Sequence, residues 1–308
     1  MAAPARRILR QGLLAPSIYA ARLLFGLLPW AQAQRVGRGL GRLAARVARR
    51  DTRRALEHLA VAFPELDSGQ REERVRASYR HLGMAAAELL HLWARPPQEA
   101  LQHVHIEGFD HVTKLRSEGR AVLILTGHCG NWELISCANE SHGLQLAAMA
   151  RDLEDAKIQR IAHSLREHFG SETVARGSRS AGRQLLRILR GGGALALLID
   201  QDIETESVFV PFFGRLANTP TAAADIALRL GAGVVPTFSE RLEDGSHRVT
   251  FHPPLDLPNN AQRATALMTA SIEAQIRRRP DQWVWFHRRW RRRPASEEAE
   301  AGELGAAR

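Results

Sequence analysis

From Val104 to the C-terminal region, short runs of aliphatic and β-branched residues alternate with segments whose apolar residues recur at helical spacing. Short apolar runs bounded by glycine, proline or polar residues are typical of buried strands. Strands that alternate with helices predict an α/β fold, a mostly parallel sheet flanked by helices. Residues 233–252 have the pattern of a hairpin, so we expect a mixed sheet. The expected strands are 103–106, 121–126, 145–150, 194–199, 208–213, 233–238, 247–252 and 283–287, and the expected helices are 109–117, 132–142, 154–168, 179–190, 220–231 and 261–279.

The residues before this alternating region carry helical patterns. Residues 35–63 are amphipathic, and a second helix, capped by Asp67 or Ser68, is expected to run to about Trp93. The chain is therefore expected to divide into a membrane anchor or interfacial helix at 1–34, a helical preface at 35–100, an α/β core at 101–294 and a disordered tail at 295–308.

The positive charge of the chain is concentrated at its N-terminal end. The formal net charge is +10, and the first 54 residues hold twelve arginines and a single acid, Asp51. Between Arg10 and Gln32 the sequence is mostly apolar, which suits a membrane anchor or an interfacial helix with the flanking arginines on the cytoplasmic side. Arg22 would cost about 2.5–3.5 kcal/mol at the centre of a spanning helix. The stretch 35–54 would contact anionic headgroups, with about 1 kcal/mol per basic residue.

Two other interpretations use the same residues. A signal peptide fits the early arginines, Arg6 and Arg7 among them, but Pro16 and Arg22 interrupt its apolar region. Nucleic-acid binding fits an arginine-rich arm, but the chain has only two tyrosines and neither zinc-finger spacing nor an RNA-binding aromatic signature. An apolar run beside the basic residues favours a lipid surface, and we expect no nucleic-acid partner.

A histidine and a glutamate follow the apolar run 121–126 closely. In the block His128-Cys129-Gly130-Asn131-Trp132-Glu133 the imidazole and the carboxylate lie five positions apart. Residues five apart on a continuous helix point about 140° away from each other, so the two meet only if the backbone turns between them. Gly127 and Gly130 permit such a turn. The block therefore predicts a base with its orienting carboxylate, with an ordinary hydrogen-bonded pair as the alternative.

Metal and disulfide chemistry find little support in the sequence. One histidine and one carboxylate supply only two ligands, and neither H-E-x-x-H nor C-x-x-C accompanies them, so no metal site is expected. Cys129 and Cys137 are too few for a disulfide framework, which fits a reduced, cytoplasm-facing compartment. Cys129 is a weaker candidate for a nucleophile than for a packing residue.

Charged residues also follow other predicted strands. Asp200-Gln201-Asp202 comes directly after strand 194–199, Arg151 follows 144–150, and Arg176 and Arg179 surround Gly177-Ser178. Open α/β sheets bind ligands at the carboxyl ends of their strands, so these side chains are candidates for a phosphate pocket. Turn-forming aspartates and solvated arginines are the alternatives.

Together these motifs resemble the late acyltransferases of lipid A biosynthesis, a group that also includes mycobacterial phosphatidylinositol mannoside acyltransferases. The resemblance covers nearly the whole chain, to about residue 294. The matching pieces are Ala62-Phe63-Pro64, 127–133, 200–202, 208–214, 229–232 with Val235-Pro236, and 283–290 with Arg293-Pro294. Arg151 departs from the family pattern, because Asp152 follows it where a proline-containing step is expected.

The resemblance implies transfer of a fatty acyl group from acyl-carrier protein or coenzyme A to a hydroxyl of a glycolipid, with no bound cofactor. His128 would act as general base on the acceptor hydroxyl, and Glu133 would fix the imidazole tautomer, with Asp200 as a rival for that role. Backbone N–H groups near Asn131, or Arg151, would hold the developing oxyanion. The residues expected to contact substrate are Asn131, Arg151, Arg176, Arg179, Asp202 and Arg288.

Several alternatives stay open at this point. The acceptor could be a lipid A precursor, a phosphatidylinositol mannoside, an ornithine lipid or a lysophospholipid, and a non-enzymatic membrane or nucleic-acid binding protein is the third hypothesis. The basic residues 288–293 could meet an acidic carrier protein or the membrane surface. The stretch 208–214 is either core or the lining of an acyl-chain groove. The expected location is the cytoplasmic face of the inner membrane.

Overall fold

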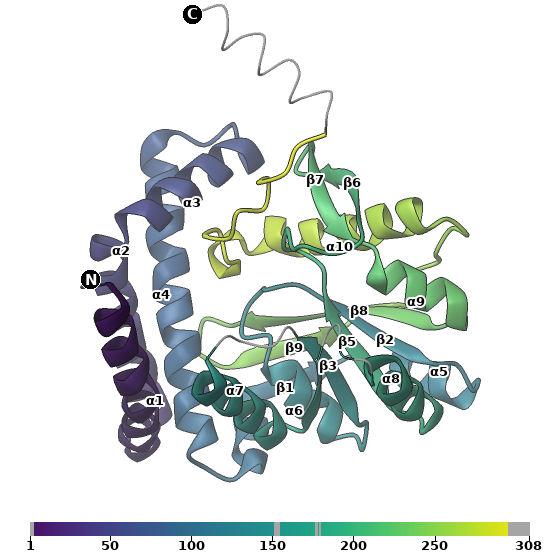
Figure 1. Ribbon diagram of the computed structural model, residues 1–308, viewed down its shortest axis with the longest axis horizontal. Coiled ribbons are helices and arrows are strands. Elements are labelled where there is room, and N and C mark those ends of the chain that lie inside the picture. The colour runs from purple at the N-terminus through teal and green to yellow at the C-terminus, as the bar shows by residue number, and fades with distance from the viewer. Residues whose placement is uncertain (1–2, 151–154, 176–177, 179, 295–308) are drawn as a thin grey trace, which may run out of the picture.

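The computed structural model describes residues 3–150, 155–175, 178 and 180–294 (Figure 1). The tail expected at 295–308 lies outside the described residues, as do Arg151, Arg176 and Arg179.

A seven-stranded sheet forms the centre of the α/β part. Its strands stand in the order β1 (Val104–Glu107), β9 (His247–Phe251), β8 (Gly233–Arg241), β2 (Val122–Thr126), β5 (Ala194–Leu198), β3 (Leu146–Ala150) and β4 (Ser171–Ala175). Every neighbouring pair is parallel except β8 and β9, which form the expected hairpin. The prediction of a mixed, mostly parallel sheet flanked by helices is confirmed.

Helices cover both faces of this sheet, and the alternation of side chains along β2 shows why. Leu123 and Leu125 join one apolar cluster. Val122 and Ile124 point the other way and join a second cluster. Because β2 is apolar at every position, both of its faces are buried. The first cluster includes residues of α8 (Ala181–Arg190), α9 (Ala222–Leu230) and α10 (Ala261–Arg278), and the second includes residues of α5 (Asp110–Ser117) and α6 (Leu134–Glu140).

Two strands were not expected from the sequence, and one expected strand is absent. The edge strand β4 has a polar pattern, and β7 (Arg215–Pro220) pairs with β6 (Ser207–Phe212) in a separate hairpin that packs on α10. The strand predicted at 283–287 is wrong: Trp283 makes a single bridge to Cys129, and the chain then turns. Trp283 and Trp285 are spaced like residues on one face of a strand. However, the Trp285 backbone N–H donates to the Trp283 carbonyl oxygen, so it is not available to a neighbouring strand.

Within the stretch 208–214, Val210, Phe212 and Phe213 belong to the hydrophobic core, whereas Pro211 and Gly214 are exposed. Phe212 and Phe213 are buried, and their rings lie against Trp283 and Trp285 respectively, at centroid distances of 5.8 Å and 6.1 Å. The alternative of an acyl-chain groove finds no support from these contacts.

The N-terminal helices form a group beside the α/β part, with α4 running along it (Figure 1). They are α1 (Ala3–Leu27), α2 (Trp30–Val47), α3 (Arg49–Ala62) and α4 (Ser68–Trp93), and short 3-10 helices at η1 (Pro97–His103) and η2 (Pro280–Gln282) and the helix α7 (Ala156–His168) complete the described elements. The helical pattern expected over 35–63 is confirmed, but the backbone breaks at Ala48, so α2 and α3 are separate helices. The predicted N-cap of α4 is confirmed: Asp67 accepts from the Gln70 N–H in a capping box.

Small residues bring α2 close to α4. A Cβ on Gly41 would lie 2.2 Å from the Tyr79 carbonyl oxygen, so only glycine allows the two helices to approach this far. This contact fixes which side of α2 faces inward. Val36, Leu40, Leu43 and Val47, which recur at helical spacing, are left on the exposed side.

Helix α1 contacts the C-terminal end of α4 through Arg22. Arg22 Nε donates to the Trp93 carbonyl oxygen at 3.0 Å, and its guanidinium lies 4.4 Å from the centroid of the Trp93 ring. Among the described residues, no helix combines the length and the hydropathy needed to cross a membrane.

Candidate active site

His128 and Asp200 meet because β2 and β5 are parallel neighbours. Thr126 pairs with Leu198 in the ladder, and His128 and Asp200 each stand two residues beyond this pair. The His128 Nδ1 lies 2.8 Å from the Asp200 Oδ1. An ionised carboxylate can only accept, so Nδ1 carries the proton and Nε2 is left as the basic nitrogen.

Asp200 is held as an ionised carboxylate. Its side chain is 1% exposed, and its second oxygen accepts from the His128 backbone N–H and from the Trp283 indole N–H, both at 2.8 Å. Burial would raise the pKa of Asp200, but the neighbouring His128 and the hydrogen bonds from His128 and Trp283 outweigh it and hold that pKa well below its usual range. Asp200 is therefore built to orient the imidazole and to stabilise its protonated form.

The turn between β2 and α6 depends on glycine. Gly130 has φ +62°, and a Cβ at this position would lie 1.8 Å from the Ser239 carbonyl oxygen. The expected turn is therefore present. It directs Glu133 away from His128, so the two side chains do not meet as predicted.

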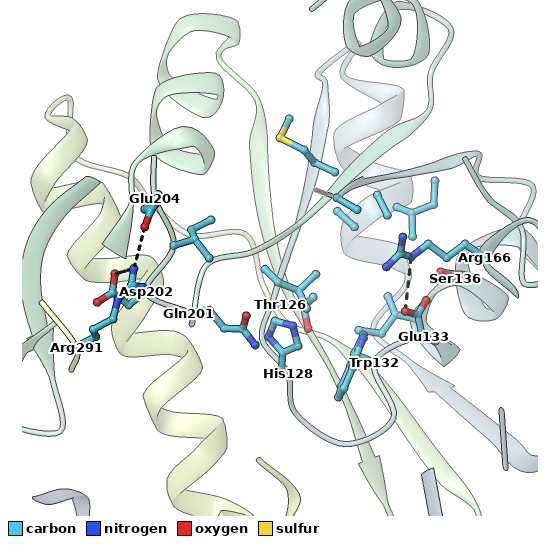
Figure 2. A pocket seen from close by; sticks show the side chains of 18 residues that line it. Thr126, His128, Trp132, Glu133, Ser136, Arg166, Gln201, Asp202, Glu204 and Arg291 are labelled. Atoms are coloured by element: carbon cyan, nitrogen blue, oxygen red, sulfur yellow. Dashed lines mark ion pairs between the residues drawn. The ribbon is translucent and has the colours of Figure 1, made fainter. Parts of the chain in front are cut away.

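Glu133 pairs with an arginine that the sequence did not single out. Its Oε1 lies 3.7 Å from the Nε of Arg166, on α7. Figure 2 shows Trp132 between His128 and Glu133, and the His128 and Trp132 rings pack edge to face with centroids 5.0 Å apart. The prediction that Glu133 orients His128 is corrected, because Asp200 occupies Nδ1. A catalytic contribution of Glu133 stays a prediction.

His128 opens into a cavity of about 420 Å³ (Figure 2). One part of the wall is polar, with Glu133, Arg166 and Gln201. The other part is aliphatic and follows the strands β3 and β5 away from the histidine. It is lined by Ile135, Leu146, Ala148, Met149, Ala150, Ala196, Leu198 and Ile203. The site therefore joins a base to a surface that suits an alkyl chain.

Of three other predicted substrate contacts, Asp202 lines this cavity, and Asn131 and Arg288 do not. Asn131 is buried, and its Nδ2 donates to the Glu88 Oε2 at 3.1 Å, so it does not line the cavity. Asp202 lines the cavity, but its Oδ1 accepts from Arg292 Nε at 2.7 Å, so its charge is already paired. Arg288 is exposed in a neighbouring cavity. Arg151, Arg176 and Arg179 fall outside the described residues.

A buried ionic network beside the Gly130 turn was not predicted from the sequence. Glu88 is fully buried on α4 and pairs with Arg241 at 2.6 Å and with His247 at 3.0 Å. Burial would raise the pKa of Glu88, but Arg241 and His247 outweigh it and hold that pKa well below its usual range. His81, which also contacts Arg241, lies 3.1 Å from the Gly130 carbonyl oxygen, so the network reaches the turn. The one available signal was an acid at 88 among apolar helix residues.

Both cysteines are buried free thiols. Burial raises the pKa of Cys129 well above its usual range and that of Cys137 to about 12. A thiol in this state is a poor nucleophile, so Cys129 is a packing residue, as expected.

The depressed pKa of Asp200 predicts a loss of stability in acid. Because the unfolded chain binds this proton more readily, the stabilisation is present above about pH 4 and is lost as the pH falls below that value. We expect the urea unfolding free energy of the wild type to drop between about pH 5 and pH 3, and Asp200→Asn to show a shallower drop. If the unfolding free energy fell equally steeply with pH in the two proteins, the depressed pKa would not belong to Asp200.

A histidine–aspartate pair at the carboxyl ends of neighbouring parallel strands, opening into a partly aliphatic cavity, can activate a hydroxyl nucleophile. The sequence profile described as bacterial lipid A biosynthesis acyltransferase matches residues 3–292. The chain belongs to this family, and it is an acyltransferase.

Individual relatives span most of the chain. It is 27% identical over 276 residues to a lipid A biosynthesis palmitoleoyltransferase of Escherichia coli, covering 88% of each protein. It is 28% identical over 253 residues to the lipid A biosynthesis myristoyltransferase of the same organism, covering 80% of this chain and 77% of the relative. It is 24% identical over 266 residues to a phosphatidylinositol mannoside acyltransferase of Mycolicibacterium smegmatis, covering 85% of this chain and 86% of the relative.

Proposed function

We propose that this protein transfers a fatty acyl group from a thioester, on acyl-carrier protein or coenzyme A, to a hydroxyl of a lipid A precursor. The observation that carries the proposal is the His128–Asp200 pair at the mouth of a cavity with an aliphatic wall. Family membership and the names of several relatives support the choice of acceptor.

We infer the following chemistry from this geometry. His128 Nε2 takes the proton of the acceptor hydroxyl, and the oxygen of this hydroxyl attacks the thioester carbonyl. Asp200 stabilises the imidazolium that forms. The tetrahedral intermediate collapses to an ester, and the departing sulfur receives the proton from His128. The aliphatic wall would hold the acyl chain of the donor.

We place the reaction at the cytoplasmic face of the inner membrane. The exposed side of α2 presents Leu40 and Leu43, which are 53% and 54% exposed, and Leu27 of α1 is 81% exposed. Arg38 and Arg42 of α2 are also exposed. Exposed leucines beside arginines suit an interfacial helix on anionic lipid.

Incubating the protein with labelled acyl donor and a panel of acceptors tests this proposal. The panel holds a lipid A precursor, a phosphatidylinositol mannoside, an ornithine lipid and a lysophospholipid, and mass spectrometry identifies the product. We expect acylation of the lipid A precursor, and a loss of about 10²-fold or more with His128→Ala. Acylation of the lysophospholipid alone would refute the proposed acceptor. A His128→Ala variant of wild-type activity would refute the mechanism.

A further inference from the structure

A second cavity lies between α3 and the segment that follows η2. We call it the arginine cavity; its volume is about 360 Å³. It is lined by Arg50, Arg53, Arg54, Glu57, His58, Arg288, Trp290 and Arg291. It thus joins the two basic regions of the sequence, the N-terminal stretch and the C-terminal cluster, in one place.

Specific contacts hold the two walls of the arginine cavity together. Arg54 Nη1 donates to the Phe286 carbonyl oxygen at 2.9 Å, and His58 Nδ1 lies 2.8 Å from the Trp285 carbonyl oxygen. The His58 and Trp290 rings pack edge to face, with centroids 5.1 Å apart. The cavity is therefore a built feature of the fold.

The charge of the arginine cavity is poorly balanced. Five guanidinium groups line it against one carboxylate, that of Glu57. Arg50 and Arg288 have no ion-pair partner among the described residues, although Arg54 pairs with Asp51 at 3.0 Å. In addition, the buried indole N–H of Trp290 has no hydrogen-bond partner in the described part of the chain. Unpaired cations on both walls, with an unsatisfied buried donor on one of them, indicate a site for an anion.

Arg291 lines both the arginine cavity and the cavity of about 420 Å³ at His128, which we call the catalytic cavity. On the catalytic side it lies 3.8 Å from Asp202 and 3.9 Å from Glu204 (Figure 2). The arginine cavity and the cavity at His128 are therefore neighbours that meet at the Arg291 side chain.

We propose that the arginine cavity binds a phosphate monoester on the acceptor and so positions the acceptor hydroxyl at His128. This inference rests on the proposed function, because it concerns the acceptor of that reaction. A phosphate monoester carries up to two charges and three acceptor oxygens, which match several guanidinium forks better than a carboxylate does. The donor thioester is expected to reach His128 along the aliphatic wall instead.

Binding is tested first, without catalysis. In a His128→Ala background, glucose 1-phosphate should raise the midpoint of thermal unfolding, whereas glucose should not. The double substitution Arg50→Gln/Arg288→Gln should abolish this shift. The matched control, Arg229→Gln/Arg263→Gln, removes two exposed arginines from α9 and α10 and should keep it. Equal shifts in both double variants, or none with the phosphate, would overturn the site even if the protein acylates lipid A.

Kinetics then identify the source of the phosphate. For a phosphorylated glycolipid acceptor, Arg50→Gln/Arg288→Gln should raise KM about tenfold or more with little change in kcat. The same variant should act like the wild type on the acceptor after phosphatase treatment. A rise in the KM of the donor instead, or equal losses on both forms of the acceptor, would overturn the assignment. Reduced sedimentation with vesicles of anionic phospholipid at unchanged acceptor KM would likewise assign the arginines to the lipid surface.

Discussion

An Asp200→Asn variant is expected to lower kcat by about 10²–10⁴-fold and to leave the KM of the acceptor close to that of the wild type. Asparagine has the same shape but presents an N–H or a neutral oxygen to His128 Nδ1, so neither the tautomer nor the imidazolium is secured. Steady-state acylation kinetics with saturating donor measure the effect. Circular dichroism of the purified variant checks that it is folded.

Two further variants make this test decisive. The double variant His128→Ala/Asp200→Asn should lose no more activity than His128→Ala alone, because residues that act as one unit are not additive. Glu133→Gln removes the partner of Arg166 and tests the separate prediction of a catalytic Glu133. A large kcat loss in Glu133→Gln, together with wild-type kinetics for Asp200→Asn, would return the orienting role to Glu133.

A Glu88→Ala variant is expected to lower the unfolding free energy by about 3–5 kcal/mol, because it leaves the guanidinium of Arg241 buried without a counter-charge. Glu88 has no exposed side-chain surface and Arg241 only 6%. Its carboxylate also accepts from Gln34 at 2.7 Å, so the substitution loosens α2 as well. Urea unfolding followed by tryptophan fluorescence measures the change.

The matched control is Glu72→Ala on the same helix. Glu72 pairs with Arg76 at 2.6 Å, but both side chains are more than half exposed. Pairs of this kind contribute about 0–1 kcal/mol. A similar small loss in Glu88→Ala would show that the buried network does not stabilise the fold.

Patterns that act over a few residues predicted much of this structure. The apolar run of β2 and the cap at Asp67 are local signals, and the structure contains both. β4 was missed because an edge strand is only partly buried and need not be apolar. The segment 283–287 has the alternation of a strand, but its backbone pairs with itself and with Cys129.

The partners within the site were harder to predict, because they depend on strand order. His128 and Asp200 were each placed at a strand end, yet 72 positions separate them, and only the adjacency of β2 and β5 makes them a pair. Glu133 is close to His128 in sequence, but the turn at Gly130 directs its side chain toward Arg166 instead. Likewise, Glu88 and Arg241 are 153 positions apart, so no local pattern joins them.

The adjacency of β2 and β5 also determines when, during synthesis of the chain, His128 and Asp200 can pair. The two strands between them in sequence, β3 and β4, lie to the far side of β5 in the sheet, so β5 must insert between β2 and β3. A nascent chain that ends before Ala194 carries His128 but lacks its acid. Such long-range pairing forms slowly relative to local structure. The His128–Asp200 contact therefore forms only after residue 200 has been synthesised and β5 has paired with β2.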